Sequence, residues 1–437
     1  MREVIEEVKK EVIPDEELRE KAEKAAKELE KRLKRELEKY PDLEYRFLGS
    51  FARDTWLPES LEIDVFVLFP ESYPEKDLER IGLEIGKNVL DEVELRYAAH
   101  PYVHGKVLGI EADVVPCYKL KSPEKIKSAV DRTPFHHEWL KDRIKGKEND
   151  VRVLKRFLKA SNLYGAEYKV RGFSGYLCEL LIVFYGSFEN LVREAANWRR
   201  DLVIDIAEKK VYRRRGLKNI FVVDPVDKKR NVAANLSVDN LARFVEKCRL
   251  FIEKPSKDFF YPEKEVVNKE KMKKELEERF VFVVRFERPS VVEDNLYPQL
   301  EKASRRIAEF LENNDFEVVR TGHYATDEEC LLLIETAYEK LGKVRKHFGP
   351  PFEVYEHSMR FIKKNRPYKH FFEEGRYATY VERKFVSAEE AIRACIREHW
   401  KSLGADVGEK IREGAVKRLL SCEGMEEFIW DFLKLKP

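Results

Sequence analysis

Two acidic residues alternate with apolar residues in a short segment near the N-terminal end of the chain. In Leu61-Glu62-Ile63-Asp64-Val65, the carboxylates occupy every second position. Successive side chains of a β-strand point to opposite faces, so this spacing predicts a strand whose two carboxylates share one face. The three apolar residues would then enter the core. The segment therefore predicts a strand that directs two negative charges toward one point.

A third carboxylate follows in the segment EADVVPCY, where Asp113 alternates with Val114. A neighbouring strand would place Asp113 beside Glu62 and Asp64. Clustered carboxylates repel one another and are costly unless a cation lies among them. Oxygen ligands of this kind favour Mg²⁺, which keeps its remaining positions for water and substrate phosphate. Two such ions about 4 Å apart would activate a hydroxyl and stabilise a leaving pyrophosphate. The pattern therefore predicts phosphoryl transfer.

A lone Glu-x-Asp on a strand is more often a solvated edge than a metal site, so its context matters. Gly49 and Ser50 lie shortly before it. Glycine permits a tight turn, and Ser50 would cap the helix that follows. The N-terminus of that helix would offer backbone N–H groups to a triphosphate, and Arg53 would add positive charge one turn later. This context favours a nucleotide site.

The spacing of apolar residues along the sequence predicts the helices and strands that hold these residues. Apolar residues at helical spacing over residues 2–40, interrupted at Pro14, predict two opening helices. An α/β unit follows, with a strand and a short helix over residues 45–56, a strand over 61–70, a helix over 75–91 and strands over 93–99, 104–110 and 111–120.

Two further regions follow this unit. From about residue 135 to residue 255 the periodicity is mainly helical, and a break at PSKDFFYPEKE precedes a new α/β pattern with FVFVVRFERP as a strand. A length of 437 residues exceeds one ordinary hydrophobic core, so we expect three domains. The predicted fold class is α+β and multidomain.

Composition limits the class of protein. Charged residues make up 38% of the chain, and no run of 18 apolar residues occurs, which argues against a membrane protein. The net charge is only +2, so any nucleic-acid surface must be local; residues 119–171 hold fifteen Lys or Arg against seven Asp or Glu. Six cysteines without CxxC spacing indicate neither a zinc ribbon nor a disulfide framework. The charged N-terminus lacks a signal segment, so we expect a cytoplasmic protein.

Several motifs together resemble a known family. Gly49-Ser50, Glu62-x-Asp64 and Asp113 resemble the signature of the DNA polymerase β-type nucleotidyltransferase superfamily. Longer segments resemble the archaeal (class I) CCA-adding enzymes, among them GSFARDTW, LEIDVF, HPYVHG, SAVDRTPFHHEWL, EYKVRGFSGYLCELLI and VDPVDKKRNVAANLS. The resemblance covers nearly all of residues 1–320 and is weaker in the last hundred residues.

The resemblance implies a polymerase β-like nucleotidyltransferase palm, a helical central domain and an α/β C-terminal RNA-binding body with a helical tail. We assign these parts to residues 1–125, 126–260 and 261–437. It also implies that the metal-binding catalytic carboxylates are Glu62, Asp64 and Asp113, and that the triphosphate, the sugar and the base of the nucleotide meet Ser50, Arg53, His136, Lys155, Tyr164 and Arg230. The resemblance also implies His100, in HPYVHG, as a member of the site.

Each nucleotide-binding assignment has a structural alternative. His136 could cap or pack a helix, Lys155 could be a solvated helix residue and Tyr164 could belong to the core, as could Tyr176. Arg230 ends the run Lys228-Lys229-Arg230, and such runs are more often solvated turns than base readers. Only the resemblance favours base recognition by Arg230.

The predicted function is template-independent addition of C, C and A to the 3′ end of immature tRNA from CTP and ATP, with Mg²⁺ as cofactor. Basic and aromatic residues in KFVSAEEAIRACIREHW and HSMRFIKKNRPYKHFFEEGRY suit structured RNA, although solvated helix faces explain them equally well. The family interpretation is that body and tail bind the acceptor stem and TΨC arm. The alternatives are another RNA 3′-terminal nucleotidyltransferase of poly(A) or poly(U) type, and a non-catalytic RNA-binding protein. A homodimer is kept as a candidate for the oligomeric state.

Overall fold

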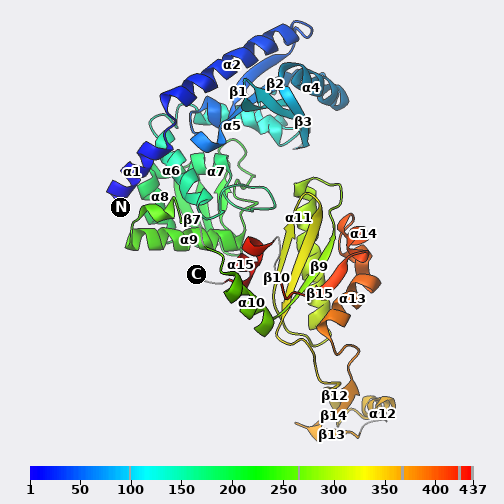
Figure 1. Ribbon diagram of the computed structural model, residues 1–437. Coiled ribbons are helices and arrows are strands. Elements are labelled where there is room, and N and C mark those ends of the chain that lie inside the picture. Colours follow the sequence, from blue (N-terminus) through cyan, green and yellow to red (C-terminus); the bar gives the residue numbers. More distant parts are fainter. Residues whose placement is uncertain (98–99, 264–265, 366–368, 422–424, 435–437) are drawn as a thin grey trace. The chain divides into compact units, whose positions relative to one another are not determined.

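The computed structural model describes residues 1–97, 100–263, 266–365, 369–421 and 425–434 (Figure 1). The chain divides into two compact units, Met1–Glu263 and Lys264–Pro437. The predicted catalytic and central domains both fall within the first unit, and their boundary near residue 125 stays a prediction. Each unit is described by itself below.

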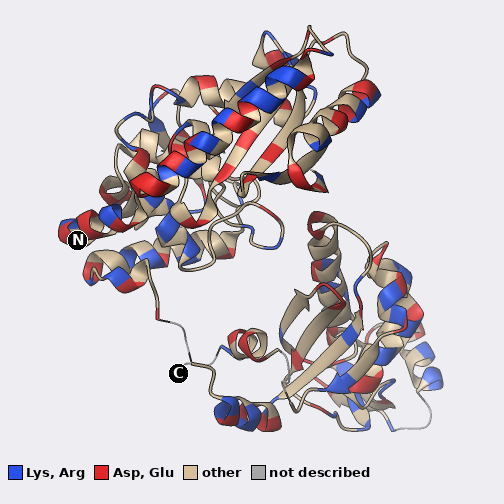
Figure 2. Cartoon of the chain, turned by 45° about the horizontal axis from the view of Figure 1, so that its top comes forward, with Lys and Arg blue, Asp and Glu red and all other residues tan. Residues whose placement is uncertain are grey.

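Two helices open the first unit, as predicted. Helix α1 spans Arg2–Val12 and α2 spans Glu16–Leu37, with Pro14 in the break between them. Asp15 caps α2 because its side chain accepts a hydrogen bond of 2.8 Å from the Leu18 N–H. Lysine, arginine, aspartate and glutamate are mixed along the outside of α2 (Figure 2), where i,i+4 pairs such as Lys21–Glu17 form.

A five-stranded sheet follows, in the order β1-β2-β5-β4-β3. Its strands are β1 Glu44–Leu48, β2 Glu62–Phe69, β3 Asp91–Tyr97, β4 Pro101–Val107 and β5 Ile110–Tyr118. Strands β2 and β5 are parallel, and the other neighbours are antiparallel. Every strand predicted in this region is present; Ala98 and Ala99, at the end of one of them, lie outside the described residues.

Helices cover one face of this sheet and leave the acidic face for the site. Helix α3 spans Gly49–Ala52 and α4 spans Glu75–Val89. Leu29 and Leu33 of α2, together with Ile81 of α4, pack against Ile63 and Val65 of β2 in one buried cluster. Because side chains alternate along a strand, this packing turns the carboxylates between those apolar residues toward the opposite face.

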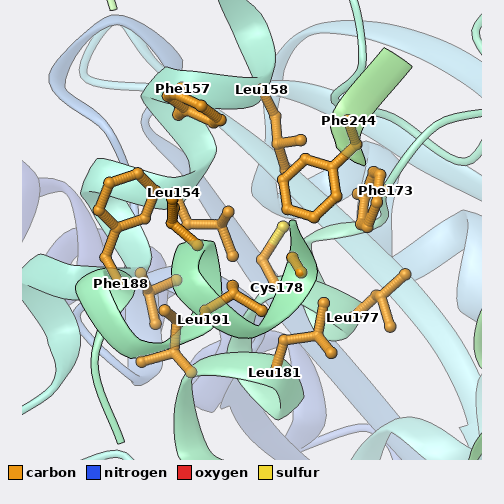
Figure 3. Close-up of a cluster of buried hydrophobic side chains, with 14 of the residues drawn as sticks. Leu154, Phe157, Leu158, Phe173, Leu177, Cys178, Leu181, Phe188, Leu191 and Phe244 are labelled. Atoms are coloured by element: carbon orange, nitrogen blue, oxygen red, sulfur yellow. The ribbon is translucent and has the colours of Figure 1, made fainter. Parts of the chain in front are cut away.

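The second half of the first unit is mainly helical. Its helices are α5 Thr133–Leu140, α6 Glu148–Lys159, α7 Gly175–Tyr185, α8 Phe188–Ala195 and α9 Val238–Glu253. A buried aromatic and aliphatic core joins α6, α7, α8 and α9, and Figure 3 shows Phe157, Phe188 and Phe244 within it. This core fixes α6 against α7, the two helices that supply Lys155 and Glu179 to the site.

The helical prediction missed a small sheet in this region. Strands β6 Leu202–Asp205, β7 Lys210–Arg213 and β8 Phe221–Val223 pair in the order β7-β6-β8. Strands of three or four residues are too short to show a clear alternation of apolar and polar residues, which explains the omission. Short 3-10 helices also occur in the chain, at Pro58–Ser60, Pro123–Lys125, Val130–Arg132, Lys257–Phe259 and Trp400–Ser402.

The second unit contains a four-stranded sheet in the order β10-β11-β9-β15. Its strands are β9 Phe280–Glu287, β10 Val318–Ala325, β11 Glu329–Thr336 and β15 Ala415–Arg418, accompanied by the helices α10 Lys269–Glu278, α11 Glu293–Glu312, α13 Ala388–His399, α14 Val407–Arg412 and α15 Glu426–Leu433. The predicted strand at FVFVVRFERP is confirmed as β9. Strand β15 was not predicted; it pairs with β9 from a distant part of the chain.

A smaller sheet of the second unit has the order β12-β14-β13. It consists of β12 Val344–Pro351, β13 Phe371–Glu373 and β14 Arg376–Glu382, with helix α12 Tyr355–Lys364. Residues 366–368 of the predicted basic and aromatic segment lie outside the described residues. Five cysteines are buried as free thiols, and Cys422 lies outside the described residues as well. In the described parts of the chain, no helix is long and apolar enough to span a membrane.

Candidate active site

The structure brings the three predicted carboxylates together on one face of the sheet. Strand β2 pairs with β5 in parallel, and the register places Asp64 directly beside Asp113 and Glu62 beside Glu111. Residues paired in this way point to the same face. The predicted strand arrangement, in which a neighbouring strand places Asp113 beside Glu62 and Asp64, is therefore confirmed.

The crowding of these carboxylates shows in their proton affinities. Burial, followed by repulsion from Glu62 and Asp113, raises the pKa of Asp64 to about 8. Burial and the charge of Asp113 also raise the pKa of Glu62. Burial raises the pKa of Asp113, although a hydrogen bond from His104 opposes this rise. The group resists full ionisation by itself, and its hard oxygen donors suit a divalent cation that would neutralise it.

A glycine lies directly against this group. Gly49 has a φ of +67°, and a Cβ at its position would be 1.7 Å from Asp64 Oδ2. Only glycine leaves room for the carboxylate there. The prediction that Ser50 caps the following helix is wrong, because Leu48 is the N-cap residue of α3 and Ser50 lies inside the helix. Helix α3 therefore begins at Gly49, two residues earlier than expected.

Arg53 is held by an acidic residue that the sequence prediction did not include. Its Nε and Nη2 donate to the two carboxylate oxygens of Glu179 on α7, at 3.0 and 2.8 Å. Thr55 Oγ1 donates to the same carboxylate at 2.5 Å. The Arg53 side chain is only 7% exposed, so this bidentate pair fixes it firmly. Its charge lowers the pKa of Asp64, which places it within electrostatic reach of the carboxylates.

Lys155 and Tyr164 lie near this pair. Lys155 Nζ donates to the Thr55 carbonyl at 2.9 Å and lies 6.0 Å from the centre of the Tyr164 ring. Burial lowers the pKa of Lys155, while the charge of Glu179 opposes that effect. A Cβ at Gly175 would be 3.0 Å from the Tyr164 hydroxyl, so the turn into α7 closes over both side chains. Lys155 is therefore a buried lysine and not the solvated helix residue of the alternative interpretation.

Two more predicted residues, His136 and Arg230, gather around a buried carboxylate together with Tyr176, which was not predicted as a site residue. Asp224 Oδ2 accepts from His136 Nε2 at 2.9 Å and from Arg230 Nη1 at 2.8 Å. Tyr176 donates its hydroxyl to Asp224 Oδ1 at 3.3 Å, and its ring stacks on His136 with 3.9 Å between centroids. Asp224 is fully buried. One carboxylate thus orients His136, Tyr176 and Arg230.

This arrangement makes a stability prediction for Asp224→Asn. Burial alone would raise the pKa of Asp224, but its hydrogen bonds and the charge of His136 lower it to about 2, from an ordinary value of 3.8. A lowered carboxyl pKa stabilises the fold above pH 4, and that stabilisation is lost as the pH falls toward 2. The stability difference between wild type and variant should shrink by about 2 kcal/mol over this range. Denaturant unfolding at several pH values measures it; a difference that does not change with pH would contradict the account.

The sequence prediction also missed a histidine at the carboxylates. His104 on β4 pairs across the sheet with Asp113, and its Nδ1 lies 2.7 Å from Asp113 Oδ1. The segment HPYVHG contains two histidines, and the prediction chose His100. His100 instead contacts Glu79 and Glu75 of α4, at 3.3 and 3.5 Å. The alternation along HPYVHG did not distinguish the two, because the distinction depends on the register of β4 against β5.

Comparisons with known proteins agree with this geometry. Residues 22–136 match the nucleotidyltransferase domain family, 149–261 the second domain of tRNA nucleotidyltransferase and 277–418 the C-terminal domain of CCA-adding enzyme. The chain is 56% identical to a CCA-adding enzyme of Archaeoglobus fulgidus over 414 residues, which cover 94% of this chain and 93% of the relative. It is 40% identical to one of Methanocaldococcus jannaschii, covering 88% of each.

A solved structure of a poly(U) polymerase bound to MgGTP aligns with the chain at a TM-score of 0.45 and 15% identity. The alignment covers 59% of this chain and 94% of the other.

Proposed function

The chain belongs to the family of archaeal CCA-adding enzymes, and from this premise we propose how its residues carry out the reaction. The family activity is the template-independent addition of C, C and A to the 3′ end of tRNA from CTP and ATP, with release of pyrophosphate. The observation that supports the proposal most strongly is the register of β2 and β5, which joins Glu62, Asp64 and Asp113 on one face.

We assign Mg²⁺ to the three carboxylates Glu62, Asp64 and Asp113. Their hard oxygens, their common face and the raised pKa of Asp64 fit a divalent cation. When bound, Mg²⁺ supplies charge neutralisation for the triphosphate and activation of the attacking 3′ hydroxyl. The protein contributes positioning, because the strands β2 and β5 hold the three carboxylates in place before the substrates arrive.

The nucleotide is assigned to the neighbouring residues of the first unit. We propose that Ser50, Arg53 and Lys155 bind the triphosphate, with His136 and Tyr164 at the phosphates and sugar. Two cations, Arg53 and Lys155, lower the pKa of Asp64, so they lie where a triphosphate beside the carboxylates would find positive charge. Glu179 keeps Arg53 in one orientation while leaving its Nη1 beside His137 Nδ1, at 3.5 Å.

We propose that Arg230 reads the incoming base. Its Nη1 is anchored on Asp224, and its side chain is still 35% exposed, so part of the side chain remains accessible. An anchored guanidinium presents its donors in a fixed plane, which suits recognition of a base edge. The alternative that Arg230 is only a solvated turn residue does not explain its bond to a fully buried carboxylate.

The second unit is assigned to tRNA, at the acceptor stem and TΨC arm. Around the small sheet, large apolar side chains are exposed at Phe348, Phe352, Tyr355, Phe372 and Tyr380. Basic residues lie between them, as at Lys346, whose Nζ is 5.2 Å from the centre of the Phe348 ring. Exposed aromatic rings next to cations suit stacking on bases and contact with phosphates.

The test uses tRNA that ends at the discriminator base. With CTP alone we expect two nucleotides to be added, and with CTP and ATP together a third, read on a sequencing gel. Long homopolymer tails, or equal use of an RNA without tRNA structure, would indicate the poly(A) or poly(U) alternative. The family comparisons do not favour that alternative. Binding of tRNA without pyrophosphate release would indicate a non-catalytic RNA-binding protein.

A further inference from the structure

His104 lies among carboxylates on the acidic face of the sheet. Its Nδ1 is 2.7 Å from Asp113 Oδ1 and 3.4 Å from Glu62 Oε1, and its Nε2 is 2.8 Å from Glu111 Oε2. Strand β4 holds it there, because His104 and Asp113 are direct partners in the antiparallel register. Both residues are buried, at 8% exposure each.

We propose that His104 is a positioning residue for the metal site: its Nδ1–H holds the Asp113 carboxylate in the orientation that binds the divalent cation, and Glu111 holds the other side of the ring. The inference rests on the proposed function, because it concerns how the catalytic carboxylates are held. A carboxylate on a strand can still rotate about its last side-chain bond. A hydrogen bond to one oxygen fixes that rotation and leaves the second oxygen to the cation.

The geometry argues against two simpler roles for His104. A direct metal ligand needs a ring nitrogen with a free lone pair, but both nitrogens face carboxylate oxygens, which are acceptors. A histidine that only fills the core would lie on the other face of the sheet with Val103 and Val107, which are fully buried there. His104 instead alternates with them and points to the face of Asp113.

The test compares Mn²⁺ affinity of the full-length protein and its variants, with Mn²⁺ as an EPR-visible substitute for Mg²⁺. His104→Ala should weaken Mn²⁺ binding about 10–100-fold, the range seen when a partner of a metal ligand is lost. His104→Asn should recover most of the affinity, because its amide can still donate to Asp113. Glu111→Ala should weaken binding in the same direction but less. Arg80→Ala on α4, which removes exposed ion pairs with Asp77 and Glu84, is the control.

A second measurement separates positioning from general stability. In the His104→Ala variant, the kcat for CTP addition at low Mg²⁺ should fall tenfold or more and should recover as Mg²⁺ is raised, with the KM for tRNA unchanged. A variant that only loosened the fold would show a lower melting temperature and no rescue by Mg²⁺. The Glu111 side chain is 45% exposed, so Glu111→Ala is the variant least expected to disturb folding, and it is measured in the same way.

The outcomes distinguish this inference from the function on which it rests. If Asp64→Asn lowers Mn²⁺ affinity while His104→Ala, His104→Asn and Glu111→Ala all bind like wild type, the positioning role is wrong and the transferase assignment stands. If the His104→Ala and His104→Asn variants lose affinity equally, donation to Asp113 is not the cause, and the proposal is also overturned. Weak Mn²⁺ binding by His104→Ala together with recovered binding by His104→Asn supports the positioning role.

Discussion

Asp64→Asn is expected to lower the rate of CTP incorporation into tRNA by more than about a thousandfold, which corresponds to about 4 kcal/mol of transition-state stabilisation. The substitution keeps the shape of the side chain and removes the charge that holds the cation. Burial and repulsion from Glu62 and Asp113 both oppose ionisation of Asp64. The variant should therefore unfold at no lower temperature than the wild type in the absence of divalent ions.

The measurement is single-turnover extension of tRNA lacking CCA with labelled CTP, together with tRNA affinity by filter binding. Affinity should change little, because the proposed RNA contacts lie elsewhere. Asp77→Asn, on the exposed surface of α4, removes a carboxylate that pairs with Arg80 at 3.2 Å and serves as control. Turnover within tenfold of wild type in Asp64→Asn would end the assignment of the carboxylates.

Gly49→Ala should be nearly as damaging, although alanine adds a single methyl group. That group would come within 1.7 Å of Asp64 Oδ2 and 2.6 Å of Asp64 Cγ, so the carboxylate or the start of α3 must move. Displacement of a metal ligand by an ångström costs a rate factor of about a hundred or more. We expect CTP addition to fall at least that far while tRNA binding is retained, measured in the same single-turnover assay.

The control for this variant is Gly146→Ala. Gly146 also has a positive φ, of +77°, but a Cβ there meets no atom within 4 Å. Both variants carry the backbone strain of a left-handed alanine, about 1–2 kcal/mol. Only Gly49→Ala carries the contact with Asp64. Equal losses of activity in the two variants would show that strain, and not the position of the carboxylate, limits the reaction.

The features that the sequence predicted depend on local spacing. The alternation of Glu62 and Asp64 with apolar residues fixes their common face whatever the neighbouring strand is. The break at Pro14 and the cap at Asp15 likewise depend on neighbours within one helical turn. The alternation of Asp113 with Val114 in a second strand likewise pointed to the third carboxylate. The family resemblance then supplied His136, Lys155, Tyr164 and Arg230, which no local pattern identifies.

The features that the sequence did not predict depend on contacts between distant residues. Arg53 and Glu179 are 126 positions apart, and His136 and Asp224 are 88 apart, so no spacing rule connects them. The carboxylates of Glu179 and Asp224 are both buried, and a buried carboxylate needs a basic partner such as Arg53 or His136. The sequence analysis did not identify His104 for the same reason, since the register of β4 against β5 places it beside Asp113.

We propose that Glu62, Asp64 and Asp113 together hold the divalent cations against the nucleotide. Anomalous scattering from crystals grown with Mn²⁺ and CTP tests it most directly. We expect manganese within about 2 Å of oxygens from all three carboxylates, with the triphosphate beside it. Manganese found only elsewhere, for example at the group formed by Glu75, Glu79 and His100, would contradict it.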